Sequence, residues 1–376
     1  MKKWVNVFVL LTSFSIANAQ VDVSLQKEIE HSVINGLKYL ASVQEDDGSW
    51  QHHPAITGLV LSSFLRAHPS IGIKDTTIKK GIDFLTKLVQ TDGGIYADDM
   101  KTYTTAICVM TFEDLGVAEY SDIILNGKKF LMSMQMDEEL GLTVDSIYYG
   151  GLSYGKMDKA PDLSNLQWAL EAISYESQDL DRADALQTKV DPEQKKIFFD
   201  KAITFLERTQ NYKTNDQAYA SNDGGFMYRP GESKAGETIS YGGMTYAGLK
   251  SMIFAKVSKD DERVQAAFNW IKNNYSVEEN PGMGLQGLYY YYQTMAKALS
   301  VMGIEELNTP KGEANWRSDL ADQLIKIQNS DGSWVNSNGR WWENNPVLVT
   351  AYSLLALETI AGLPHNISTQ KTLRIE

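Results

Sequence analysis

Two helical patterns of hydrophobic residues alternate along this chain. In the first, exemplified by residues 25–43, apolar positions recur at helical spacing on one face only, which predicts a half-buried amphipathic helix. In the second, the stretch is apolar on nearly every side and belongs in a protein interior. Stretches of the second kind occupy residues 55–64, 104–112, 166–173, 244–254, 285–299 and 347–357.

A short motif ends each amphipathic stretch and leads into a glycine turn. The fullest copy combines the pair Tyr39 and Leu40 with Gln44, Gly48 and Trp50. Five more copies contain the pairs Phe84–Leu85, Phe130–Leu131, Phe205–Leu206, Trp270–Ile271 and Leu324–Ile325. Self-similarity at fairly regular spacing predicts a repeat architecture.

Two copies of the motif depart from the first. The fifth has Tyr275 about where the glutamine is expected, and in the third we expect the turn glycine at Gly141. Six pairs of half-buried and fully buried helices still describe an outer ring around an inner ring. The sequence therefore predicts an all-α fold, an (α/α)6 toroid that forms a single domain over residues 20–376.

Residues 1–19 have the features of a secretory signal peptide. Lys2 and Lys3 precede an apolar core, and Ala17-Asn-Ala19 provides a small-residue cleavage site before Gln20. We expect this segment to be removed and the protein to be periplasmic or extracellular. The residue directly after the cleavage site is Gln20 and not a cysteine, so a lipid anchor is not expected.

The charge balance and the single cysteine narrow the possible partners. Without Lys2 and Lys3 the 35 basic residues become 33 against 48 acidic ones, a net charge of −15. Such a surface repels nucleic acid and anionic membranes. Cys108 is the only cysteine and lies in an apolar run, so we expect a buried side chain and no internal disulfide. We expect neither a cofactor nor a transmembrane segment, and the oligomeric state stays open.

The motif from Tyr39 to Trp50 and its twin from Leu324 to Trp334 resemble the QW repeats of the squalene cyclase and protein prenyltransferase superfamily. The resemblance extends over about residues 25–360, with further likeness in residues 161–170, 224–231 and 345–352. It implies a terpenoid cyclase-like toroid with a site at the N-terminal ends of the inner helices.

Residues at the starts of the inner helices are therefore the candidate ligand-binding residues. Helix N-termini present unpaired N–H groups and the positive end of the helix dipole, which suits a polar or anionic group. Trp341 and Trp342 lie in an asparagine-rich polar loop, where we expect at least one to be exposed beside the cavity. The candidates are His53, Tyr103, Asn165, Tyr228, Arg229, Tyr241, Trp341 and Trp342.

Asp162 is the candidate catalytic residue. In protonating cyclases the corresponding motif is Asp-x-Asp-Asp-Thr, and its middle Asp protonates the alkene. This chain has Asp162-Leu-Ser-Asn165-Leu, so the resemblance implies that the general acid is missing. Asp162 also fits the role of N-cap for its inner helix, and the two roles are compatible.

The sequence lacks the ligands of the zinc-dependent relatives. Protein prenyltransferases hold zinc with an Asp, a Cys and a His, whereas here the only cysteine is Cys108 and no histidine lies between His68 and His365. We therefore expect no metal. Residues 151–155 match the Gly-x-Ser-x-Gly nucleophile pattern, but no strand pattern precedes them, so a loop is expected.

Three hypotheses of function remain. The first is a secreted terpenoid-cyclase-like protein with a central cavity for an isoprenoid or other apolar ligand; any reaction would be a cyclisation or isomerisation. The second is a non-catalytic toroid that binds a lipid, peptide or protein. The third is a carbohydrate-active (α/α)6 enzyme such as a polysaccharide lyase, with His53 or a tyrosine as base and Arg229 or Arg340 opposite a uronate.

Overall fold

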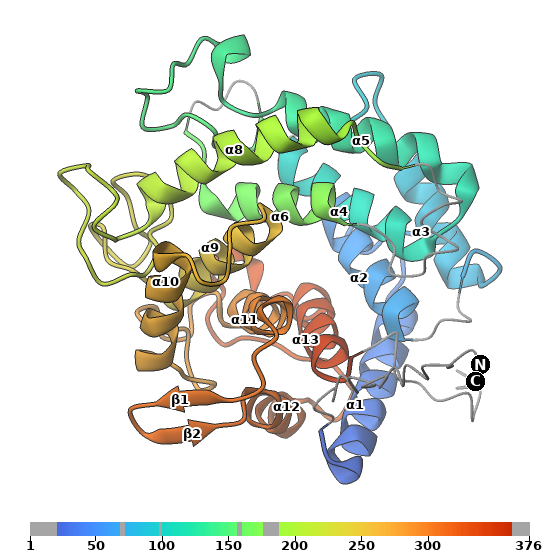
Figure 1. Ribbon diagram of the computed structural model, residues 1–376. Helices are drawn as coiled ribbons and strands as arrows, with labels where there is room; N and C mark the ends of the chain where they lie inside the picture. The colour runs from blue at the N-terminus through green and yellow to red at the C-terminus, as the bar shows by residue number, and fades with distance from the viewer. Residues whose placement is uncertain (1–20, 68–71, 98–99, 156–159, 176–187, 363–376) are drawn as a thin grey trace, which may run out of the picture.

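The computed structural model describes residues 21–67, 72–97, 100–155, 160–175 and 188–362 (Figure 1). These residues contain twelve α-helices, one short hairpin and three short 3-10 helices, Ala118–Tyr120, Glu138–Leu140 and Arg340–Trp342. The expected signal peptide, residues 1–19, lies outside them. The outer helices are α1 (Val23–Ser42), α3 (Thr76–Thr86), α5 (Ser121–Ser133), α8 (Pro192–Thr209), α10 (Glu262–Asn273) and α12 (Trp316–Ile327). The inner helices are α2 (Pro54–Ala67), α4 (Lys101–Leu115), α6 (Leu163–Ser174), α9 (Gly242–Phe254), α11 (Leu288–Met302) and α13 (Pro346–Ile360).

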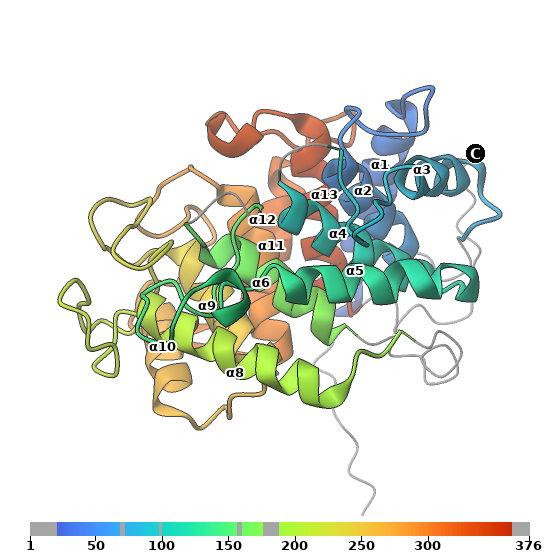
Figure 2. The same cartoon turned by 90° about the horizontal axis from the view of Figure 1, so that it is seen from above.

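The inner helices form a closed ring. Each packs against the next, and α13 returns to pack against α2 (Figure 1). The outer helices cover this ring, and Figure 2 shows α5 and α8 along one flank of it. The predicted all-α (α/α)6 toroid is confirmed.

The two hydrophobic patterns match the two rings. Helix α1 buries one face, whereas almost every residue of α9 and α13 is buried. A helix that is apolar all round is stable only when other elements surround it. Here the ring neighbours and the outer helices surround it together.

The repeat glutamines join neighbouring repeats. The Nε2 group of Gln44 donates to the carbonyl of Gly48 in its own turn (2.9 Å) and to that of Thr77 in the next outer helix (3.0 Å). Gln328 does the same across the closure of the ring, donating to Gly332 (2.9 Å) and to Ser32 (2.9 Å) in α1. Both contacts are to backbone carbonyls, so the side chain fixes each turn against its neighbour.

Two repeats use different residues from those expected. In the third, Gly141 has open space around it, and Gln135 instead donates to Gly150 (3.1 Å). Gly150 has φ 83° and its Cα faces the carbonyl of Lys201 so closely that a Cβ would lie 1.8 Å from the oxygen. The expectation of Gly141 was therefore wrong, because the turn that packs on the next outer helix comes nine residues later.

The degenerate fifth repeat keeps the link to its neighbour by another route. The hydroxyl of Tyr275 donates to Asp319 in α12, the next outer helix (2.8 Å). The repeat tryptophans are likewise structural: the indole N–H groups of Trp50 and Trp334 donate to carbonyls ten residues earlier (2.8 Å each), and both side chains are buried. The hairpin of β1 (Leu307–Thr309) and β2 (Gly312–Ala314) lies at the edge of the toroid, before α12 (Figure 1).

Candidate functional site

The N-terminal ends of the inner helices surround a cavity of about 980 Å³. Every inner helix contributes to its wall, through the first turn or the residue just before it. One wall residue from each, in chain order, is His53, Lys101, Ser164, Gly243, Tyr290 and Leu348. The toroid therefore places residues that are far apart in sequence around a single space.

Side chains at this mouth cap the helices that begin there. Asp162 accepts from the N–H of Asn165 (2.9 Å) at the start of α6. Glu343 accepts from the N–H groups of Tyr289 (3.0 Å) and Tyr290 (2.8 Å) at the start of α11. These acceptors satisfy N–H groups that the first helical turn leaves unpaired. Both carboxylates therefore stabilise the N-terminal ends of inner helices.

Asp162 is buried behind the wall of the cavity. Its side chain has no exposed surface and it does not line the cavity, whereas Tyr228, to which it is hydrogen-bonded, does. Burial raises the pKa of Asp162 to about 6, although hydrogen bonds from Asn165 and Tyr228 and the charge of Arg229 favour the carboxylate. Any effect of Asp162 on a ligand must therefore pass through Tyr228.

Six tyrosines line the wall of the cavity. The hydroxyls of Tyr103 and Tyr352 are 2.9 Å apart, and that of Tyr290 lies 3.5 Å from Ser164 Oγ. Burial raises the pKa of each tyrosine above 10, so the hydroxyls are neutral. The six are Tyr103, Tyr154, Tyr228, Tyr241, Tyr290 and Tyr352.

The structure brings six of the nine sequence candidates to the cavity and leaves three behind it. Asn165 is buried and donates to Asp162 Oδ2 (2.8 Å). The guanidinium of Arg229 stacks on the ring of Tyr228, 5.0 Å from its centroid, and lies 3.7 Å from Glu232. With Asp162, these side chains support the wall. The six that line it are His53, Tyr103, Tyr228, Tyr241, Trp341 and Trp342.

Sequence reasoning did not single out several wall residues. Tyr154 lies in the loop that matches the nucleophile pattern; there Ser153 is buried and donates to the carbonyl of Gly155 (2.8 Å). Glu343 and Tyr290 also line the cavity, and both lie at the starts of inner helices, where the sequence predicts the site.

His53 is held as a neutral hydrogen-bond donor. Its Nδ1 accepts from the N–H groups of Ala55 (3.2 Å) and Ile56 (3.4 Å), so Nε2 carries the proton. Burial lowers the pKa of His53, which also favours the neutral ring. This geometry suits hydrogen-bond donation better than the role of base.

Trp341 and Trp342 form the rim of the cavity and are 45% and 55% exposed. Both have left-handed backbone angles, with φ of 56° and 64°. The guanidinium of Arg340 lies 4.3 Å from the ring centroid of Trp341, and the ring of Trp342 meets that of His53 edge-on at 5.6 Å. The rim is thus aromatic, exposed and fixed on its inner side.

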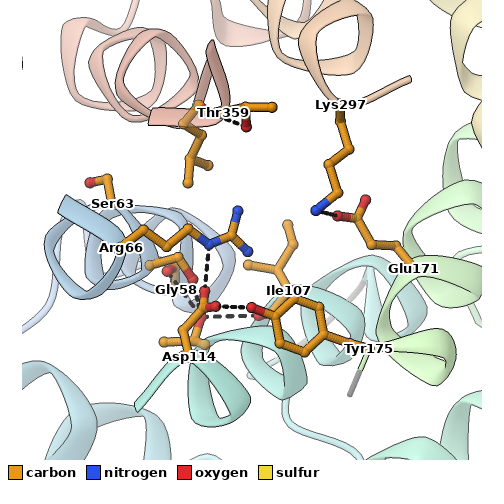
Figure 3. A network of polar contacts seen from close by, with 12 residues as sticks. Gly58, Ser63, Arg66, Ile107, Asp114, Glu171, Tyr175, Lys297 and Thr359 are labelled. Atoms are coloured by element: carbon orange, nitrogen blue, oxygen red, sulfur yellow. Dashed lines mark hydrogen bonds and ion pairs between the residues drawn. The ribbon is translucent and has the colours of Figure 1, made fainter. Parts of the chain in front are cut away.

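The opposite end of the toroid is filled by buried charges (Figure 3). Arg66 Nε lies 2.9 Å from Asp114, which also accepts from the hydroxyl of Tyr175. Glu171 pairs with Lys250 (2.6 Å) and Lys297 (3.1 Å). Arg66, Asp114, Glu171 and Tyr175 lie in or just after the last turns of their inner helices, whereas Lys250 and Lys297 lie further inside α9 and α11. None of these residues lines the cavity. The cavity therefore belongs to one end of the ring only.

Neither a metal cluster nor a membrane span is found in the described part of the chain. No group of three His, Cys, Asp or Glu side chains there could hold a metal ion, and no helix there is long and apolar enough to cross a bilayer. Cys108 is buried with its Sγ 3.7 Å from the carbonyl of Pro54, and burial raises its pKa.

Comparison with solved structures identifies the fold. A variant of the type II terpene cyclase MstE from Scytonema, in complex with geranylgeranyl dihydroxybenzoate, is 10% identical; the match covers 91% of this chain and 99% of that one with a TM-score of 0.54. The apo form of MstE matches at 11% identity, 90% and 99% coverage and a TM-score of 0.53. The chain has the terpenoid cyclase-like toroid fold, as the sequence resemblance implied.

A glycosidase variant shares the same fold. It is 10% identical, with coverage of 91% of this chain and 99% of that one and a TM-score of 0.50. No protein-family model matches this sequence. No curated protein matches it either. Since both cyclases and a glycosidase use this toroid, the fold alone does not choose a substrate.

Proposed function

We propose that this protein is a terpenoid-cyclase-like protein whose cavity binds an isoprenoid. The observation that carries the proposal is the cavity of about 980 Å³ at the inner-helix starts, whose wall is largely aromatic and aliphatic. This volume lies near the upper end of the range of about 300–1,000 Å³ for sites that enclose a small molecule. An isoprenoid is long and largely apolar, and it suits a space of this size and lining.

Apolar side chains of the cavity wall are suited to contact an isoprenoid chain. Ile56, Met134, Met244 and Leu348 provide apolar surface between the tyrosine rings. Methionine side chains adapt to irregular apolar ligands, and aromatic faces pack well against branched hydrocarbon. The MstE complexes contain a geranylgeranyl compound on the same fold, which agrees with this choice without deciding it.

The acid chemistry of the site argues against direct alkene protonation by Asp162. A carboxyl group with a pKa of about 6 is a weak acid, and this one touches Tyr228 instead of the cavity. Alkene protonation requires an exceptionally strong, correctly placed acid. The proposal therefore concerns binding, and any catalytic role of Asp162 would act through Tyr228. The substitution Asp162→Asn keeps an N-cap for α6 but removes the acidic group. If a substrate is found and this variant turns it over at the wild-type rate, Asp162 has no catalytic role.

A cavity-filling variant tests the proposal. A Cβ on Gly243 would find its nearest neighbours at 3.6 Å or more, so Gly243→Phe fits the helix and projects a ring into the cavity. Gly72→Phe is the matched control, because nothing lies within 4 Å of its Cβ and Gly72 is not part of the cavity. Isothermal titration calorimetry with geranylgeraniol should show saturable binding to the wild type and to Gly72→Phe, and at least tenfold weaker binding to Gly243→Phe.

Two results would contradict the proposal. One is a wild type that does not bind geranylgeraniol. The other is a Gly243→Phe variant that binds as tightly as the wild type while both melt cooperatively, since the ligand would then occupy another place. Comparison of melting temperatures separates lost binding from lost folding.

A further inference from the structure

The exposed rim of the cavity is not explained by binding of an apolar chain. The cavity tyrosines Tyr241, Tyr290 and Tyr352 are buried or half-buried, as a hydrocarbon site requires. Trp341 and Trp342, in contrast, leave 45% and 55% of their surface in solvent. Exposed large apolar side chains that border a cavity mark a place where something binds.

The rim is rigid before any ligand arrives. Two consecutive non-glycine residues with φ of 56° and 64° are unfavourable, and such strain persists only where surrounding contacts enforce it. Gly287 is one such contact: a Cβ there would lie 3.0 Å from the ring of Trp341. Arg340, stacked on Trp341, is also hydrogen-bonded to Gln286. These contacts hold the backbone of the loop in place, and therefore also the position of the more exposed ring, that of Trp342.

A polar donor lies directly beside this ring. The His53 ring is 5.6 Å from that of Trp342, and its capping bonds leave Nε2–H as a donor whose proton position is fixed. Glu343, the neighbouring carboxylate, is occupied by helix α11 and by Asn336 Nδ2 (2.7 Å). The rim thus combines an open aromatic face with a hydrogen-bond donor.

We infer that the rim binds a pyranose ring, so that the ligand is an isoprenoid glycoside with its chain in the cavity and its sugar on Trp342. The inference rests on the proposed function for the chain-binding part. One face of a pyranose carries C–H groups that pack on an indole, while its edge carries hydroxyls that accept from a donor such as His53. A bare hydrocarbon end would use neither the exposed face nor the donor.

The test compares geranylgeranyl β-D-glucoside with geranylgeraniol by calorimetry. The wild type should bind the glucoside at least tenfold more tightly than the alcohol. Trp342→Ala should abolish this advantage by weakening the glucoside at least fivefold more than the alcohol, whereas Trp342→Phe should keep most of it. His53→Asn provides an independent variant, because asparagine can cap α2 but lacks Nε2–H; it too should weaken the glucoside more than the alcohol.

The outcomes separate the two proposals. Equal affinities of the wild type for both probes overturn the sugar site and leave isoprenoid binding intact. Binding of the glucoside alone overturns the proposed function and keeps the sugar site. Binding of neither probe overturns both. If Trp342→Ala does not melt cooperatively, the Trp342→Phe and His53→Asn results decide, and equal loss for both probes in His53→Asn contradicts the inference.

Discussion

The two ends of the toroid are built from the same six inner helices, but the side chains at the two ends differ in charge and in packing. At the N-terminal end, side chains cap the helices and leave a cavity of about 980 Å³ with an exposed, strained rim. At the C-terminal end, the helices close on ion pairs such as Arg66 with Asp114 (Figure 3) and Lys250 with Glu171. One end is open to a ligand and the other is filled.

Helix direction accounts for much of this difference. The last turns of the inner helices carry exposed carbonyls and the negative end of the dipole, so buried cations are favourable there. Arg66 lies in the last turn of α2 and meets that need, whereas Lys250 and Lys297 lie further inside α9 and α11. Carboxylates pair with all three cations. At the opposite ends the need is for acceptors, which His53 and Glu343 supply from the cavity wall and Asp162 supplies from behind it. The comparison predicts that damage at the filled end costs stability, while change at the mouth costs little.

The largest effect is expected from Lys250→Met. The substitution leaves Glu171 buried with only the more distant Lys297, and removing one partner of a buried pair costs about 3 kcal/mol of unfolding free energy. Urea unfolding followed by circular dichroism measures it. The double variant Lys250→Met with Glu171→Leu should recover most of the loss, because no lone carboxylate remains.

Lys196→Met is the matched control for this experiment. It breaks the exposed pair of Lys196 with Asp200 on α8, and we expect no measurable change in unfolding free energy. Equal stability of Lys250→Met and Lys196→Met would show that the charged network does not hold the filled end together.

A smaller effect concerns the pH dependence of stability at the filled end. Neither carboxylate oxygen of Glu358 has a hydrogen-bond partner among the described residues, and burial raises its pKa well above 4.5, although Arg66 favours the charged form. A raised folded-state pKa means that its contribution is fully present below pH 4.5 and is lost as pH rises through that higher value. Glu358→Met should therefore be more stable than the wild type at pH 8 by about 1–2 kcal/mol.

Urea titrations at pH 5 and pH 8 check this prediction. The advantage of Glu358→Met should shrink at pH 5, where the wild-type carboxyl is protonated for more of the time. A constant difference at both pH values would mean that Glu358 does not titrate with folding. A wild type that is the more stable protein at pH 8 would mean that Arg66 stabilises the carboxylate.

Local spacing explains why the fold could be predicted from the sequence. The contacts of Gln44 and Gln328 reach a turn four residues away and the adjoining helix, so the motif carries its own geometry. Gly141 was chosen wrongly for the same reason: the motif was expected close to Gln135, but a longer loop delays the packing glycine to Gly150. Loop length depends on what a loop packs against, which a repeat pattern does not encode.

The site was less predictable because side-chain direction is set by tertiary packing. Asp162 and Tyr228 are both close to inner-helix starts, yet one lies behind the wall and the other forms it. The sequence also contains a signal for the charged residues at the filled end. Glu171, Lys250 and Glu358 are isolated charges within apolar inner-helix stretches, and such charges are buried only when something faces them. Glu171 and its partner Lys250 are 79 residues apart, so the sequence alone does not show that they pair.

A modest gain in stability is expected when strain at the mouth is relieved. Gln51, in the turn before α2, is exposed and has φ 58°, a left-handed angle that glycine adopts without cost. Gln51→Gly should raise the unfolding free energy by about 0.5–1 kcal/mol. Gln26→Gly, at a right-handed position within α1, should lower it by about 1 kcal/mol. If both variants lose stability alike, the mouth is not strained.

The smallest effect separates two adjacent histidines at the mouth. The hydrogen bond that His52 Nδ1 donates to Asp47 Oδ2 (2.9 Å) raises the pKa of His52 above 6.5, whereas burial lowers the pKa of His53 below it. Since the neutral form of His53 is favoured by folding, its stabilising contribution is present above pH 6.5 and is lost as pH falls. An NMR titration of the imidazole C–H signals, assigned with His52→Gln and His53→Asn, should show His52 titrating at higher pH than His53.

Ligand binding sharpens this last comparison. If Nε2–H of His53 donates to the bound sugar, geranylgeranyl β-D-glucoside should shift the His53 signals and leave those of His52 unchanged, because His52 is turned toward Asp47 on the surface. A His53 that titrates at or above His52 would contradict the fixed neutral ring. The mouth would then carry a cation beside Trp342, and an anionic head group would become the better partner for the rim.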